Sequence, residues 1–178
     1  MRPVDPFASP ERLIERVYAY AAYRIGSGPD ADDVVQETFA RALRYRDSFD
    51  PRKGDPAAWL VGIARRCLAD RGVQAVDVLL PEPEQASTAD EFETHAVARL
   101  DLQDALATLE PRERELLSLR FGADLTAKQI GGLVGLKTNA VEVALHRALA
   151  RLRAQLAEDA GASASSRSTA RPLAAPTD

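Results

Sequence analysis

The apolar residues of this 178-residue chain recur mainly at helical spacing, in two groups of segments separated by a stretch without that pattern. Side chains three and four residues apart share one face of a helix, so this spacing predicts amphipathic helices. Three such stretches lie at 13–25, 35–43 and 59–68, and the second group extends from 97 to about 158. No run of any length alternates with the period of a strand. The sequence therefore predicts an all-α fold.

The first group predicts a small N-terminal domain over residues 9–71, a bundle of three to four helices. Its third helix has a clear start signal, because Asp55 is suited to the N-cap and Pro56 to the first helical position. Residues 72–95 follow with no Lys or Arg and six acidic residues. Together with Pro81 and Pro83, this composition predicts a flexible acidic linker.

The second group predicts a C-terminal domain of four helices over residues 96–158. Thr126 and Gln129 have the spacing of a capping box and predict a short helix over 127–134. A turn containing Gly135 and a longer helix from about Thr138 follow, which gives the outline of a helix-turn-helix. Residues 159–178, rich in Ala, Ser and Pro, are predicted to be a disordered tail.

The last helix separates into an apolar and a polar face. The predicted polar face carries Asn139, Val143, His146 and Arg147, with Arg151 at its flank. A helix in a major groove needs polar groups for base edges, an apolar group for thymine methyls and cations for phosphate. Asn139, Val143 and Arg147 would supply one of each. The alternative interpretation is an ordinary amphipathic hairpin whose arginines form a solvated rim.

Several strings, in order, resemble one family of bacterial proteins. DADDVVQETFARA (30–42) and AWLVGIARR (58–66) are similar to the N-terminal domain of sigma factors of the extracytoplasmic-function (ECF) group. LEPRERE (109–115), LRFG (119–122) and HRALARLR (146–153) resemble their C-terminal domain. The resemblance covers about residues 10–157. It implies a subunit that directs core RNA polymerase to promoters.

By this resemblance, Asp32, Asp33, Gln36 and Glu37 would dock on the clamp helices of the largest polymerase subunit. The spacing of Asp33, Gln36 and Glu37 places them on one helix face, which agrees with such a contact. The alternative is an acidic first turn that only suits the helix dipole. That alternative explains the aspartates well and Gln36 poorly.

The resemblance also assigns a loop, residues 47–54, to capture of a flipped base and stabilisation of the melted strand at the −10 element. The residues expected there are Arg44, Arg46, Phe49, Arg52, Lys53, Arg65 and Arg66. Cations suit the strand's phosphates, and aromatic faces suit unstacked bases. Phe49 is equally well interpreted as a core residue, and Trp59 is better interpreted as one. Arg65 and Arg66 are expected near the exposed side of their helix.

The helix-turn-helix would read the −35 element. The residues expected there are Lys137, Thr138, Asn139, Val143, His146, Arg147 and Arg151. The implied partners are promoter DNA, the clamp helices and flap region of core RNA polymerase, and an anti-sigma factor. The linker would thread the RNA exit path, where its six acidic groups suit a basic channel.

Two features depart from the family pattern. The sequence has no basic cluster after Arg71, which weakens the expected grip on duplex DNA upstream of the −10 element. Gly131 and Gly132 stand in the first helix of the pair, where each costs about 1 kcal/mol of helix propensity relative to Ala. The missing cluster slightly favours one alternative, a sigma-like mimic that sequesters an anti-sigma factor, although the arginines of the last helix oppose it. Another alternative, a plain helix-turn-helix repressor, is opposed by the polymerase-docking string.

The sequence offers little evidence for metal binding, catalysis or a membrane span. Cys67 is the only cysteine, and His95 and His146 lack companions at metal-ligand spacing. We expect no metal, no cofactor and no catalysis. No apolar run approaches the roughly 18 residues of a membrane span. The first residues lack the apolar stretch of a signal peptide, so we expect a cytoplasmic protein without membrane insertion.

Overall fold

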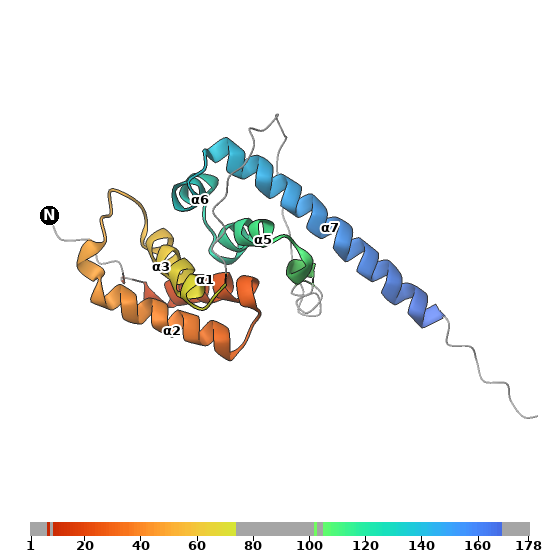
Figure 1. Cartoon of the computed structure of the whole chain (residues 1–178), viewed down its shortest axis with the longest axis horizontal. Coiled ribbons are helices and arrows are strands. Elements are labelled where there is room, and N and C mark those ends of the chain that lie inside the picture. Colours follow the sequence, from red (N-terminus) through yellow and green to blue (C-terminus); the bar gives the residue numbers. More distant parts are fainter. Residues whose placement is uncertain (1–6, 8, 74–101, 103–104, 169–178) are drawn as a thin grey trace, which may run out of the picture.

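The computed structural model describes residues 7, 9–73, 102 and 105–168, and the part it describes contains helices and no strands (Figure 1). The all-α fold predicted from the sequence is confirmed. We use N-terminal lobe for the described residues up to 73 and C-terminal lobe for those from 102 onward. Residues 74–101, which include most of the predicted linker, lie outside the described residues.

The N-terminal lobe consists of α1 (Pro10–Ile25), α2 (Pro29–Arg44), a short 3₁₀ turn (Arg46–Ser48) and α3 (Pro56–Asp70). All three α-helices have a proline in their first turn, where its missing N–H costs no hydrogen bond. As predicted, the Asp55 side chain caps α3 by accepting a hydrogen bond from the backbone N–H of Ala58 at 3.0 Å. The helices pack on one another around buried apolar side chains, among them Val17, Val34, Leu60 and Leu68.

The C-terminal lobe contains α5 (Pro111–Leu117), one π-helical turn (Ser118–Gly122), α6 (Ala127–Val134) and α7 (Thr138–Ser168). The capping box predicted at the start of α6 is present, with the Thr126 side chain and the Gln129 side chain each accepting from the other's backbone N–H. Gly135 ends α6 in the left-handed region, with φ of 73°. The order α6, tight turn, α7 is the predicted helix-turn-helix.

Close packing explains why a glycine occupies position 131 inside α6. A Cβ atom at this position would lie 2.5 Å from the carbonyl oxygen of Leu136, so only glycine allows the turn to fold back so closely. At Gly132 a Cβ atom would meet nothing within 4 Å. The structure therefore explains the glycine at position 131 and not the one at position 132.

The predicted end of the last helix was wrong by about ten residues. α7 continues to Ser168 and projects beyond the rest of the molecule (Figure 1). The sequence pattern predicts instead that this helix ends near residue 158. The extension contains three alanines, the residue with the highest helix propensity, and no proline. The single Gly161 costs too little to stop a helix that is already formed.

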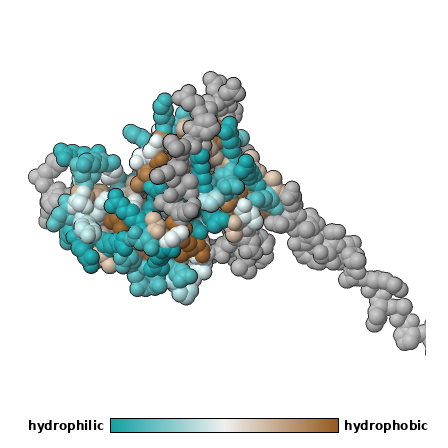
Figure 2. All heavy atoms as spheres, viewed as in Figure 1, coloured by the Kyte–Doolittle hydropathy of each residue, from teal (hydrophilic) through white to brown (hydrophobic). Residues whose placement is uncertain are grey.

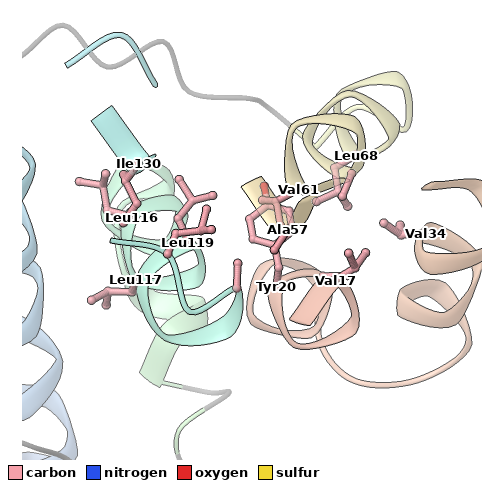
Figure 3. Packing of buried hydrophobic residues seen from close by; sticks show 14 of the residues in the cluster. Val17, Tyr20, Val34, Ala57, Val61, Leu68, Leu116, Leu117, Leu119 and Ile130 are labelled. Carbon is pink, nitrogen blue, oxygen red and sulfur yellow. The ribbon is translucent and has the colours of Figure 1, made fainter. Parts of the chain in front are cut away.

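The two lobes pack against each other, which the sequence pattern did not predict. One hydrophobic core runs through both, and α1 lies along the π-helical turn of the C-terminal lobe. Figure 3 shows Tyr20 of α1 at the side of the N-terminal lobe that faces Leu119 of the C-terminal lobe. Hydrophilic residues cover most of the visible face of the N-terminal lobe (Figure 2).

Candidate polymerase and nucleic-acid interface

The polar face of α2 is open to solvent. Asp32, Asp33 and Gln36 are exposed, as the sequence predicted, since the apolar stripe of this helix turns Val34 and Thr38 inward. Acceptor-only carboxylates next to an amide that both donates and accepts can pair with the cations and backbone groups of a partner. The structure thus brings these three side chains together on one accessible surface.

Glu37 differs from its three neighbours because a cation already binds it. Its Oε1 lies 2.5 Å from Nε of Arg41, and Nη1 of Arg41 lies 2.7 Å from Oδ2 of Asp70 on α3. The hydrogen bonds that Arg41 donates to Asp70 and Glu37 raise the pKa of Arg41. This exposed bridge joins the ends of α2 and α3, so Glu37 has a structural role beside its predicted docking role.

The exposed surface of α2 also includes an apolar residue from the stretch with helical spacing. Leu43 is 57% exposed and lies seven residues after Gln36, two helical turns along the same side. Ile14 of α1 and Phe121 of the π-helical turn, each 44% exposed, also belong to the apolar positions at helical spacing. The elements that carry these residues have more apolar positions than the adjacent elements cover. Periodicity alone therefore overestimates the number of buried residues.

Cations gather around the turn between α2 and α3. Arg44, Arg46, Arg52 and Lys53 are all exposed, as expected for groups that contact a nucleic-acid backbone. Arg52 forms a local ion pair with Asp50, at 3.1 Å between Nε and Oδ1, and its hydrogen bonds lower the pKa of Asp50. Both partners are at the surface, where phosphate groups can compete for the arginine.

The aromatic residues near this turn differ in exposure. The ring of Phe49 is half-buried against Trp59, with 5.4 Å between ring centroids, which favours the structural interpretation of Phe49. Trp59 also contacts the ring of Phe7, and its predicted place in the core stripe agrees with this packing. Tyr45, which the sequence analysis did not single out, is 56% exposed between two arginines. The sequence signal for this exposure is that Tyr45 stands at the end of an amphipathic helix, outside its apolar stripe.

Arg65 and Arg66 were both expected near the exposed side of α3, and the expectation was wrong for Arg65. Arg66 is exposed, but the side chain of Arg65 is only 15% exposed. Its Nε lies 2.8 Å from Oε1 of Glu115, and its Nη1 donates to the carbonyl oxygen of Leu133 at 2.7 Å. Packing of the C-terminal lobe on α3 removes this arginine from the surface.

Glu115 is the centre of a buried polar cluster between the lobes, formed by Tyr20, Arg24, Arg65 and Glu115, which we call the interlobe cluster. Oε2 of Glu115 lies 2.8 Å from Nε of Arg24, and the hydroxyl of Tyr20 donates to Oε1 at 3.1 Å. Side-chain exposure is 3% for Arg24 and 1% for Glu115. Burial, followed by the charge of Glu115, raises the pKa of Tyr20 well above the usual 10.0.

The start of α7 presents most of the polar groups predicted for the second DNA-binding surface. Lys137, Thr138, Asn139, His146 and Arg147 are exposed, while Val141, Leu145 and Ala148 turn into the core. Arg151 is exposed as well, and its Nη1 forms an ion pair with Oε1 of Glu113 at 2.9 Å. The first three turns of α7 therefore offer amide, imidazole and guanidinium groups to a groove.

Val143 does not share that exposure. It is 5% exposed, so the prediction that it stands on the solvated face was wrong. Removal of a β-branched apolar side chain from water lowers the free energy, which favours this burial. The argument for a contact with a thymine methyl required an exposed side chain, and we do not pursue it.

Cys67 is packed inside the N-terminal lobe, and the hydroxyl of Thr38 lies 3.8 Å from its Sγ. Burial raises the pKa of its thiol. Within the described residues there is no group of three or more His, Cys, Asp or Glu side chains arranged to hold a metal ion. The same residues include no helix long and apolar enough to cross a membrane.

Comparison with known proteins places the chain in a family. Residues 11–72 match the family Sigma-70 region 2, and residues 105–154 match Sigma-70, region 4. The chain therefore belongs to the sigma-70 family of promoter-directing RNA polymerase subunits, within its ECF group. The ECF sigma factor SigD of Mycobacterium tuberculosis is 36% identical over 158 residues, and the ECF sigma factor BldN of Streptomyces coelicolor is 31% identical over 157 residues.

The extent of these matches differs between the two relatives. The SigD match covers 79% of this chain and 71% of SigD, and the BldN match covers 84% of this chain and 60% of BldN. Among solved structures, CnrH in complex with the cytosolic domain of CnrY is 28% identical, with a TM-score of 0.58 over 84% of this chain and 83% of that one. RpoE of Bartonella quintana, bound to the anti-sigma factor NepR, shares the fold at 23% identity and a TM-score of 0.60, over 81% and 91% of the chains.

Proposed function

We propose that this chain binds core RNA polymerase through α2, opens the −10 element with the turn between α2 and α3, and reads the −35 element with α7. The observation that carries the proposal is that one chain displays three exposed surfaces of different chemistry. These are an acidic and amide face on α2, a cationic turn after it, and a mixed polar face at the start of α7.

The polymerase contact centres on Asp32, Asp33 and Gln36, with the clamp helices of the largest subunit as the proposed partner. Leu43 extends this surface with an apolar contact, because an exposed leucine on a polar face gains most when a partner covers it. Glu37 joins the contact while its carboxylate remains bound to Arg41. The C-terminal lobe would contact the flap region of the polymerase.

The −10 contact combines Arg44, Arg46, Arg52 and Lys53 as phosphate ligands with Tyr45 as a stacking surface. Aromatic stacking contributes about 1–3 kcal/mol per base and needs an accessible ring. Tyr45 has such a ring, whereas Phe49 is held against Trp59. Arg66 would reach phosphates along α3.

The −35 contact uses Asn139 and Arg147 for base edges, with Lys137, Thr138, His146 and Arg151 toward the backbone. Asparagine pairs with adenine and arginine with guanine through two hydrogen bonds each. The remaining groups fix the register of the helix on the duplex.

We further propose residues 9–71 and 96–158 as the two functional domains, 72–95 as the linker through the RNA exit path, and 159–178 as a tail whose first ten residues continue α7. An anti-sigma factor is a proposed partner, since the solved relatives include complexes with such proteins. A subunit of RNA polymerase works in the cytoplasm without membrane insertion, and its action requires no cofactor or catalysis of its own.

Run-off transcription with purified core polymerase and a genomic template library tests the proposal. The expected result is a set of start sites that share −35 and −10 sequences and that depend on this chain. Tight, specific binding of promoter DNA by the free chain at about 0.15 M salt, with no dependence on polymerase, would instead favour a repressor.

A further inference from the structure

We propose that Phe7 positions the turn between α2 and α3 for opening of the −10 element, through a row of aromatic rings that ends in this turn. The inference deepens the proposed function and rests on it, because it concerns the same −10 contact. Phe7 makes no contact with nucleic acid in this proposal. It acts through the ring of Trp59, so it is a positioning residue of the −10 surface.

Four aromatic side chains form this row, which we call the aromatic row: Phe39 of α2, Phe7 ahead of α1, Trp59 of α3 and Phe49 of the turn. The ring centroids lie 6.3 Å apart between Phe7 and Phe39, and 6.4 Å apart between Phe7 and Trp59. They lie 5.4 Å apart between Phe49 and Trp59. All three separations fall in the range of about 4.5–7 Å that favourable aromatic pairs adopt. Phe7 is therefore the residue that joins the ring of α2 to the ring of α3.

The turn, the open segment between α2 and α3 in Figure 1, has only local hydrogen bonds over residues 46–54 in the part of the chain that the structure describes. The backbone N–H of Phe49 donates to the carbonyl oxygen of Arg46 at 3.1 Å. The backbone N–H of Lys53 donates to the carbonyl oxygen of Asp50 at 2.9 Å. The ion pair of Asp50 is also local, since its partner is two residues away. The ring of Phe49 therefore anchors the turn to α3.

Phe7 limits the freedom of Trp59. Both side chains are half-buried, so the space that the Phe7 ring occupies opens to water when the ring is removed. Trp59 then keeps Phe49 but loses the ring that packs against it edge-on. Groups that bind a ligand need supports whose own rotamers are locked by packing, to within about 0.5 Å. Without Phe7, the cations of the turn lose part of that support.

Polymerase docking does not depend on Phe7 in this proposal. α2 is held in the core by Val34 and Ala42, both at 0% exposure. The proposed docking groups are exposed on this helix itself and not on the turn. Loss of the Phe7 ring leaves those core contacts in place, so strand opening and polymerase association should respond differently.

Trp59 fluorescence tests the ring contact in the free, whole chain, because Trp59 is the only tryptophan. In Phe7→Ala the emission should shift to longer wavelength, and acrylamide should quench it more strongly, since the indole gains contact with water. Ile14→Ala is the matched control, because Ile14 is 44% exposed in the same lobe and belongs to no proposed binding surface. Its emission should match that of the wild type. Helicity should be unchanged in both variants, since Phe7 lies outside α1.

Strand opening is then measured with core polymerase on a promoter found by the run-off experiment. Phe7→Ala should open the duplex about threefold more slowly or worse by permanganate footprinting, because misplaced groups lower rates steeply. Its association with core polymerase should equal that of the wild type. On the same promoter with mismatched, already unpaired −10 strands, it should transcribe as the wild type does. A variant that is merely destabilised would lose activity on both templates.

Phe7→Tyr and Phe7→Leu take over if Phe7→Ala lowers the helicity. Phe7→Tyr keeps the ring and should match the wild type, whereas Phe7→Leu keeps an apolar side chain without the ring and should open the duplex slowly. The proposal is overturned if Phe7→Leu and a folded Phe7→Ala open the duplex at the wild-type rate, or if the defect is equally large on the unpaired template. A wild-type chain that opens no promoter with core polymerase contradicts the proposed function itself. A wild-type chain that opens promoters no faster than these variants contradicts only the role of Phe7.

Discussion

Phe49 packs against Trp59, with ring centroids 5.4 Å apart and ring planes tilted by 54°. The contact ties the turn after α2 to the first residues of α3, the same turn that carries the proposed −10 cations. Trp59 also meets Phe7 edge-on, at 6.4 Å between centroids. The turn is therefore held from behind by aromatic packing while its arginines face solvent.

Phe49→Ala should lower the free energy of unfolding by about 1–3 kcal/mol, less than for a fully buried phenylalanine, because the ring is half-buried. Chemical denaturation checks this value. Phe49→Leu should recover most of the loss. Full stability of Phe49→Ala, combined with defective strand opening, would return Phe49 to the base-capturing role.

Tyr45→Ala should slow opening of the −10 region, whereas Tyr45→Phe should behave as the wild type, because stacking uses the ring and not the hydroxyl. Permanganate footprinting of unpaired thymines measures the opening. Both variants should bind core polymerase normally. Equal defects in the two variants would point to a hydrogen bond from the hydroxyl and away from stacking.

Gln36→Ala and Arg147→Ala should fail in different assays. Gln36→Ala should weaken association with core polymerase and depress transcription from every promoter alike. Arg147→Ala should leave that association intact and reduce −35 dependent initiation by about 1–3 kcal/mol if Arg147 reads a base. A loss that is uniform across −35 variants and that reduces the salt dependence would identify a phosphate contact. Reduced core binding by Arg147→Ala, with promoter preference unchanged, would contradict the assignment of α7.

Val143→Ala should lower the free energy of unfolding by about 1–3 kcal/mol, since it removes two methyl groups from a buried position. Thermal unfolding of the full chain checks this. Promoter preference should not depend on whether thymine or uracil stands in the −35 element. A variant with unchanged stability but a thymine-dependent defect would mean that Val143 is exposed when DNA is bound.

Stability should fall as the pH rises above about 9, partly through Cys67. Burial raises the pKa of this thiol above its usual value of 9.0, so the folded state holds the proton more tightly than the unfolded chain. The contribution is complete below pH 9 and is lost as the pH rises toward the folded pKa. Denaturation at pH 8 and pH 10 should show a smaller difference for Cys67→Ala than for the wild type.

The sequence by itself determined the helices, their starts and the division into two lobes. Asp55 and the Thr126–Gln129 box set their helix starts through side-chain bonds to neighbouring backbone groups. Such interactions are local, so they leave a readable spacing. The exposed groups of α2 and of the start of α7 were also predictable from a local pattern. A helix with one apolar face turns its other face toward solvent.

Only the tertiary structure decided which of these two arginines of α3 stays exposed and which binds Glu115. Arg65 and Arg66 are neighbours in the sequence, and their difference in burial comes from a lobe whose residues lie 50 positions away. The burial of Val143 and the exposure of Leu43 likewise depend on which parts of the chain cover each helix face. Periodicity reports the face on which a side chain lies, whereas its exposure depends on what packs over that face, and long-range packing leaves no spacing in the chain.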